Sequence, residues 1–247
     1  MPERMDLQRL RSEARALVRA NDYAAVKTTA LFLALSLLLS EIRVVSDTLL
    51  GKQISLAEMS ISVSYPGVLA SLLALVLHMG YQHGCLRLHR GEQPGLRGVF
   101  VPLVFAGQAV LLQLLRYSLM GFGLTLFFLP GLYFALVYAL APLALCEEPE
   151  KKSLAAMRRS RERMRGYKLA LFVLMTGFLP YVLLVLLVMV GVEMLLTPLL
   201  PDSLVGVLAC LTCENLAGGC LRAFLQPYIA LSFAGFYRCV MEERVEA

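Results

Sequence analysis

Long runs of apolar residues, separated by short polar stretches, make up most of the chain. Six of these runs hold 17 or more residues with almost no charge. A helix of about 20 apolar residues crosses a hydrocarbon core of about 30 Å. The pattern therefore predicts an all-α fold, a polytopic membrane bundle of about six transmembrane helices. We expect the spans at about residues 24–40, 67–85, 101–119, 126–145, 169–187 and 221–240.

Three connections between these spans have their own patterns. Residues 41–65 carry three acids, two bases and a serine-rich run, which predicts a surface loop with at most one short helix. Met120–Thr125 contains two glycines and predicts a tight helical hairpin. Residues 197–219 are mildly apolar but are interrupted by prolines and glycines. That stretch is a re-entrant or interfacial hairpin, or an extended start of the sixth helix, and the pattern leaves these alternatives open.

Two prolines lie within the fourth expected span. Pro130 falls in its first turn, where a proline costs little because the first N–H groups have no helical partner. Pro142 lies farther along the same span, and we expect it to kink the helix.

Composition supports the membrane assignment. Apolar residues are 58% of the chain and charged residues 17%, against about 45–50% and about 25% in soluble domains. The Lys and Arg residues near the expected span ends number nineteen on the side of the N-terminus. The other side has two in its first loop, Arg43 and Lys52, and Arg222 at the start of the sixth span. The positive-inside rule then places both termini in the cytoplasm. We expect a multi-pass protein of a bacterial plasma membrane, with a basic cytoplasmic helix at 1–23 and one transmembrane domain at 24–247.

The densest positive charge lies between the fourth and fifth spans, where eight Lys and Arg fall within residues 151–168. Within the basic helix expected at 151–166, after Pro149, Ser153 is a suitable N-cap for a helix that begins there, and Gly166 is suited to end it. Leu154, Met157, Ser160 and Met164 share one side of this helix, and Arg161 falls inside that apolar sector, from which it would have to snorkel.

Such an amphipathic helix is expected to lie on the inner leaflet, with its basic face toward anionic headgroups. The alternative is that the cluster only determines topology. The candidate contacts to anionic lipid or to a protein partner are Arg158, Arg159, Ser160, Arg161, Arg163, Arg165 and Lys168.

Charged residues inside spans are costly and are often functional. Arg116, Glu193 and Arg222 all fall toward the outer face and are candidates for a polar vestibule, although each could instead snorkel to the outer interface. We expect no acidic residue in the core of any span, which argues against a proton- or sodium-coupled pump.

Catalytic and metal-binding signals are weak. The histidines at 78, 83 and 89 do not share a helical face at i, i+4 spacing, and Cys210 and Cys213 lack a fourth zinc ligand nearby. Those cysteines, with Cys220, form a disulfide or are small apolar residues of a helix. The sequence predicts no metal, no cofactor, no catalytic residue and no nucleic-acid partner.

Several motifs resemble those of a known family. They are Pro130, Gly131, Tyr138, Pro142, Pro149, Ser160, Arg161, Met164, Gly166 and Lys168, followed by Pro227, Tyr228 and Tyr237, and preceded by Arg90-Gly91-Glu92 with Pro94. This pattern resembles a bacterial integral-membrane family known as domain of unknown function family 975. The chain departs from the family pattern at Phe134, Ala230 and Gly235, where the family has charged residues. The resemblance implies a six-helix membrane domain, distantly similar to that of some glycerophosphodiester phosphodiesterases, and implies no known activity.

Three classes of function fit these observations. The first, which the basic helix favours, is a non-enzymatic scaffold or accessory protein that contacts anionic lipid or a membrane-protein partner, with a homo-oligomer also open. The second is a permease for a small solute or a lipid. The third is a lipid-modifying membrane enzyme, for which the sequence offers no paired carboxylates.

Overall fold

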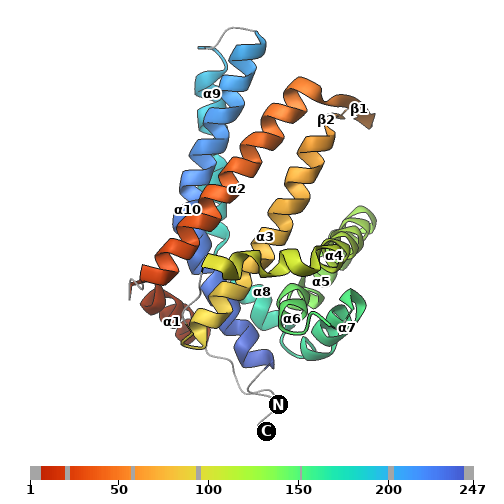
Figure 1. Ribbon diagram of the computed structural model, residues 1–247, viewed down its shortest axis with the longest axis vertical. Coiled ribbons are helices and arrows are strands. Elements are labelled where there is room, and N and C mark those ends of the chain that lie inside the picture. The colour runs from red at the N-terminus through yellow and green to blue at the C-terminus, as the bar shows by residue number, and fades with distance from the viewer. Residues whose placement is uncertain are drawn as a thin grey trace. The chain divides into compact units, whose positions relative to one another are not determined.

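The computed structural model describes residues 7–19, 23–56, 59–92, 96–150, 152–199 and 203–241. Helices make up most of them, which confirms the all-α prediction. In chain order they are α1 (Leu7–Arg19), α2 (Tyr23–Leu50), α3 (Tyr65–His89), the 3₁₀ helix η1 (Leu96–Phe105), α4 (Ala106–Leu126), α5 (Phe128–Val137), α6 (Ala141–Glu147), α7 (Ser153–Arg163), α8 (Lys168–Thr176), α9 (Leu179–Leu196) and α10 (Leu204–Met241) (Figure 1). Two short strands, β1 (Lys52–Leu56) and β2 (Met59–Val63), connect α2 to α3.

Six segments of the described chain are long and apolar enough to cross a membrane, as predicted. They are Lys27–Leu50, Tyr65–His89, Arg97–Leu126, Phe128–Glu147, Leu179–Leu196 and Leu204–Ala223. The first four overlap the expected spans closely, whereas the fifth overlaps its expected span only at residues 179–187 and the sixth only at residues 221–223. Residues 168–176 form the separate short helix α8, which ends at Gly177, so the fifth span begins at Leu179. The sixth begins at Leu204, because residues 204–219 form the start of α10. Of the alternatives for residues 197–219, the extended start of the sixth helix is therefore the correct one for this part.

The prediction of a surface loop at residues 41–65 is wrong. Helix α2 continues to Leu50, and the strands that follow pair antiparallel, with Ile54 opposite Ile61. Asp47 then fixes the start of α3, because its Oδ1 accepts hydrogen bonds from the Ser64 amide at 2.9 Å and the Ser64 hydroxyl at 2.7 Å. The longer helix also overturns the expectation that the core of every span lacks an acidic residue, since Glu41 now lies well inside Lys27–Leu50.

The connection between α4 and α5 is tighter than expected. Only Phe127 separates the two helices, and the predicted turn at Met120–Thr125 is helical. A Cβ on Gly123 would lie 2.7 Å from the Gly131 amide nitrogen, so the two glycines allow the backbones to approach. Pro142 is the second residue of α6, just after the interruption of the helix between α5 and α6, which agrees with the predicted kink.

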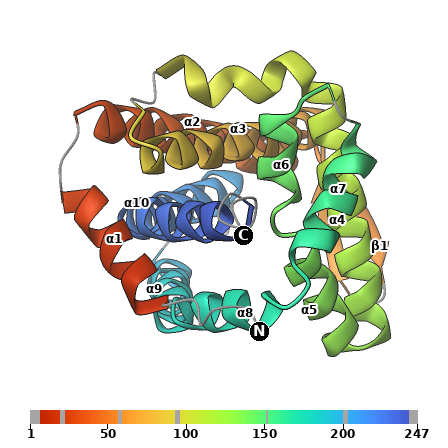
Figure 2. The same ribbon diagram turned by 90° about the horizontal axis from the view of Figure 1, so that it is seen from below.

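The chain divides into two compact units. Unit 1 comprises Met1–Thr29, Val76–Phe178 and Pro227–Ala247, and unit 2 comprises Ala30–Leu75 and Leu179–Gln226. The largest fully buried side chains of the described residues all belong to unit 1, and include Tyr81, Leu112, Leu143, Met164 and Tyr237. Figure 2 shows α4, α5, α6 and α7 of this unit lying together. Unit 1 therefore contains the packed core.

Unit 2 is built differently. Val185 is the one buried residue of α9, and the other large apolar side chains of that helix are at least partly exposed, as expected of a helix in lipid. Helix α10 packs closely on α2, because a Cβ on Gly219 would lie 2.1 Å from Leu37. Asn215 joins the same two helices: its Oδ1 accepts from the Ser40 hydroxyl at 2.7 Å, and its Nδ2 donates to Glu41 at 2.9 Å.

Candidate functional site

Helix α7 is packed on the protein along one face. Its buried residues are Ser153, Ala156, Met157 and Ser160, and Met164 continues the same face beyond the end of the helix. Spacings of three and four place these residues in one stripe, which lies against α4 and α6. The predicted apolar side is thus correct for Met157, Ser160 and Met164. It is wrong for Leu154, which is 66% exposed.

Two serines hold this face in place. The Ser160 hydroxyl donates to the Val137 carbonyl oxygen at 2.7 Å, and the Ser153 hydroxyl donates to the Gln108 carbonyl at 2.8 Å. The Ser153 amide also donates to Gln108 Oε1 at 3.1 Å. Lys152, not Ser153, is the N-cap residue of α7. The Ser153 amide has no acceptor within the helix, and the Gln108 side chain of α4 satisfies it in place of a capping side chain. The predicted cap is therefore wrong by one position.

The exposed side of α7 and of the turn after it carries positive charge. Arg158, Arg161 and Arg165 are exposed, and we call these three residues the basic stripe. Leu154 precedes Arg158 by four residues and Arg161 by seven, so it lies on the same face. Arg161 is outside the buried stripe, which corrects its predicted place in the apolar sector. Arg158 Nε also contacts Glu162 at 3.0 Å, an exposed pair one turn apart.

Three of the other residues predicted to contact lipid or a partner, Arg159, Ser160 and Lys168, bind groups of the protein itself. Arg159 Nη1 lies 2.6 Å from Glu148 Oε2, and Lys168 Nζ donates to the Tyr133 hydroxyl at 3.1 Å and lies 4.3 Å from that ring's centroid. Ser160 is fully buried, as described above. These residues fix the two ends of the basic segment, and Arg163 is half-buried between them.

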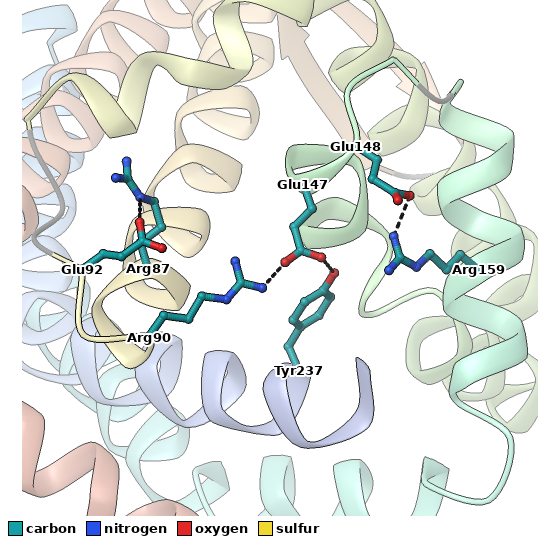
Figure 3. A network of polar contacts seen from close by, with 7 residues as sticks. All are labelled: Arg87, Arg90, Glu92, Glu147, Glu148, Arg159 and Tyr237. Carbon is teal, nitrogen blue, oxygen red and sulfur yellow. Dashed lines mark hydrogen bonds and ion pairs between the residues drawn. The ribbon is translucent and has the colours of Figure 1, made fainter. Parts of the chain in front are cut away.

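A polar network joins the ends of three helices beside α7 (Figure 3). Glu147, the last residue of α6, accepts a hydrogen bond from the Tyr237 hydroxyl of α10 and pairs with Arg90, which follows α3. Burial and the bond to Glu147 both raise the pKa of Tyr237, so its hydroxyl stays protonated and donates. The neighbouring Glu148 holds Arg159, which connects the network to α7.

One further ion pair lies at the edge of this network. Arg87 Nε is 2.6 Å from Glu92 Oε2, and this hydrogen bond holds the pKa of the exposed Glu92 carboxyl below its ordinary value. Between them Gly91 has a φ of 77°, a conformation that favours glycine. The Arg90-Gly91-Glu92 motif is therefore a turn that directs Arg90 toward Glu147.

The N-terminal helix is attached to the same unit through its arginines. Arg11 Nη2 donates to the carbonyl oxygens of Val173 and Leu174, near the C-terminal end of α8, at 3.2 and 3.3 Å. Arg15 Nε donates to the Tyr228 hydroxyl at 3.2 Å. Tyr228, a residue of the family pattern, thus anchors α1.

The remaining motif residues shape the backbone. Pro130 is in the first turn of α5, as predicted, and Tyr138 follows the last residue of the helix and stacks on Phe134 with ring centroids 6.3 Å apart. Gly166 has a φ of 92° in the turn that follows α7, a conformation that favours glycine. The helix itself ends earlier, at Arg163, so the predicted end at Gly166 is three residues too late. Pro227 lies inside α10.

The three residues predicted as a polar vestibule fall in different units. Arg116 belongs to α4 of unit 1, and Glu193 and Arg222 belong to α9 and α10 of unit 2. Glu193 and Arg222 are exposed, and within the described chain no ion pair joins them. Arg222 Nε donates instead to the Gly218 carbonyl of its own helix at 3.0 Å.

The described residues hold no group of three or more His, Cys, Asp or Glu arranged to bind a metal ion. The cysteines at 85, 146, 210, 213, 220 and 239 are free thiols, so Cys210, Cys213 and Cys220 are residues of helix α10 and not a disulfide.

Sequence reasoning missed Glu147, Glu148 and Gln108. The two glutamates stand between an apolar span and a basic segment, and this position was the available signal: acids at the edge of a basic cluster are natural partners for it. Gln108 gave no comparable signal, because its role depends on the packing of α7 against α4.

Comparison with protein-family models gives one match. The model described as Protein of unknown function (DUF975) matches residues 124–244. The match includes Glu147, Arg159, Tyr237 and the whole of α7. Neither the curated proteins nor the solved structures contain a match to the chain.

Proposed function

The chain belongs to this family, whose description states no activity, and we propose from its geometry that it is a non-enzymatic membrane scaffold or accessory protein. In this proposal the basic stripe binds the headgroups of anionic phospholipids. The observation that carries the proposal is the docking of α7 through one face, which leaves Arg158 and Arg161 of the helix, and Arg165 of the turn after it, exposed.

The position of α7 in the chain supports a lipid partner. Helix α6 ends the candidate span Phe128–Glu147, and α7 begins at Ser153, within a few residues of that end. Exposed Leu154 on the same face as the arginines suits a surface that is anionic outside and apolar beneath. Each Lys or Arg near an anionic leaflet contributes about 1 kcal/mol, so three arginines contribute about 3 kcal/mol, roughly a hundredfold in affinity.

The test compares the wild-type protein with the triple variant Arg158→Gln, Arg161→Gln and Arg165→Gln. Both are extracted gently from vesicles of phosphatidylcholine and phosphatidylglycerol, and native mass spectrometry counts the lipids that stay bound. The wild-type protein is expected to retain phosphatidylglycerol in preference to phosphatidylcholine, and the triple variant is expected to lose that preference.

A matched control removes the same charge elsewhere. Arg9, Arg43 and Lys52 are exposed cations on other elements, and their replacement by glutamine is expected to leave lipid retention unchanged. Equal retention by the wild type and the basic-stripe variant would overturn the proposal. A co-purifying protein lost only from the basic-stripe variant would replace lipid with a protein partner.

We also propose that both termini face the cytoplasm of a bacterial plasma membrane. The six candidate spans return the C-terminal segment to the side of the N-terminus, and that side carries α1 and the basic stripe. Alkaline phosphatase is active only outside the cytoplasm, so its fusion after Ala247 is expected to be inactive and a fusion inserted between Leu56 and Met59 active. The reverse pattern would refute this orientation.

A further inference from the structure

Arg116 is a cation inside an apolar span, and none of the described residues is its acidic partner. It lies within the candidate span Arg97–Leu126, half-buried on α4. Its Nε is buried and meets no hydrogen-bond acceptor in the described part of the chain, where it also forms no ion pair. The guanidinium carbon lies 5.6 Å from the ring centroid of its neighbour Tyr117, a favourable cation–π contact. An ionisable residue kept at such a place marks a functional site by default.

A second polar group without a partner lies one turn away. Gln113 is 2% exposed, and its Oε1 is buried with no donor to satisfy it among the described residues. Residues three apart on a helix share a face, so Gln113 and Arg116 present an unused acceptor and an unused donor to one region. Each unmet buried group costs free energy, and a ligand that satisfies both would remove both costs.

The depth of this cluster argues against ordinary lipid headgroups. Arg116 precedes the end of α4 at Leu126 by ten residues (126 − 116), or about 15 Å along a helix axis. Half of a hydrocarbon core of about 30 Å is the same distance. A small anion that enters from the half-buried side of Arg116 suits this position better than a headgroup of the bulk bilayer.

We propose that Arg116 and Gln113 form an intramembrane binding site for a small oxyanion that carries its own hydroxyl group, the chemistry of inorganic phosphate. Arg116 Nε donates to an anionic oxygen, and Gln113 Oε1 accepts from the hydroxyl. At neutral pH inorganic phosphate keeps at least one P–OH group, whereas sulfate keeps none. The phosphodiester of a phospholipid also has no hydroxyl on phosphorus. The unmet acceptor on Gln113 therefore favours phosphate over both.

The experiment measures binding of radiolabelled inorganic phosphate at pH 7 to the full chain in phosphatidylcholine nanodiscs. Unlabelled phosphate is expected to displace the label at a concentration at least tenfold lower than sulfate. Arg116→Gln is expected to weaken phosphate binding at least tenfold. Arg43→Gln removes an exposed arginine from another candidate span and is expected to bind as the wild type does.

Gln113→Leu separates a binding role from a structural one. It removes an acceptor that nothing satisfies in the free protein, so the unfolding temperature without phosphate is expected to stay equal or to rise. The same variant is expected to lose the preference for phosphate over sulfate. This test stands even where Arg116→Gln does not fold.

Three results would overturn the proposal: no saturable phosphate binding, equal competition by sulfate, or wild-type binding by the folded Arg116→Gln variant. Nanodiscs that contain phosphatidylglycerol distinguish the source of the anion. Loss of phosphate binding in those nanodiscs alone would assign the site to a lipid headgroup and refute a soluble oxyanion.

Discussion

The Ser160 hydroxyl of α7 donates to the carbonyl oxygen of Val137, the last residue of α5, at 2.7 Å. The last carbonyls of a helix have no partner within it, so this bond satisfies a group that would otherwise be buried and unpaired. The basic helix and the break between α5 and α6 are thereby fixed to each other. The exposed arginines around Ser160 therefore depend on this packing for the direction in which they point.

Ser160→Ala is expected to destabilise the protein by about 1–3 kcal/mol, because it leaves the buried Val137 carbonyl without a donor. Reversible unfolding in mixed micelles measures the change. Ser118→Ala is the matched control, since Ser118 is an exposed serine of α4, and its effect should stay within about 0.5 kcal/mol. Equal effects of the two substitutions would contradict the role given to the Ser160 hydroxyl.

Tyr237 and Glu147 are expected to be energetically coupled through their hydrogen bond. A double-mutant cycle with Tyr237→Phe and Glu147→Ala should give an interaction energy of about 1.5–3 kcal/mol, as for a hydrogen bond to a charged group. The exposed pair Arg158 and Glu162 provides the comparison, with about 0.3–0.5 kcal/mol expected for alanine substitutions there. A cycle on Tyr237 and Glu147 that is additive within error would mean that their contact does not hold the helix ends together.

The positions of the spans were predictable where the length of an apolar run alone determines them. The first four spans follow from runs such as 126–145, because a helix in lipid must satisfy its backbone internally whatever its neighbours are. The fifth and sixth were misplaced because the apolar run around Leu169–Leu187 crosses Gly177, where Arg11 of a distant helix binds the end of α8. A contact over such a separation leaves no local pattern.

The site was predictable in part for the same reason. Helical periodicity located the buried side of α7 at Met157, Ser160 and Met164, since spacing along one helix is local. It could not show that Arg159 turns to Glu148 or that Gln108 binds Ser153, because these partners come from other helices. The basic stripe could be separated from the other cations of this segment only once the structure showed which side chains are exposed.

Glu92 is expected to make stability depend on pH in the acid range. Its carboxyl has a pKa below the ordinary value of 4.5 because Arg87 donates a hydrogen bond to the ionised form. A depressed pKa gives stability that is fully present above pH 4.5 and is lost as the pH falls through the folded-state value. The difference in free energy of unfolding between the wild type and Glu92→Gln should therefore be constant from pH 7 to 5 and shrink below pH 4.5. A difference that does not change with pH would show that the pair contributes nothing through the charge of Glu92.

Two glycines of α4 provide the sharpest test of how the hairpin packs. A Cβ on Gly123 would lie 2.7 Å from the backbone nitrogen of Gly131 and 2.8 Å from its Cα, whereas a Cβ on Gly121 meets nothing within 4 Å. Backbone atoms cannot turn aside as a flexible side chain can, so Gly123→Ala must push α5 away from α4. The expected cost is about 1–3 kcal/mol, typical of an overpacked core.

Gly121→Ala tests whether that cost comes from the contact with α5 or from helix propensity. Alanine is favoured over glycine in a helix by about 1 kcal/mol, so this variant should be as stable as the wild type or more stable. The two substitutions are chemically identical and two residues apart, which leaves the contact with Gly131 as the difference between them. Unfolding measured under one condition for both variants decides the matter. If Gly123→Ala were as stable as Gly121→Ala, the α4–α5 hairpin would not be held at the close distance that the Gly123–Gly131 contact implies.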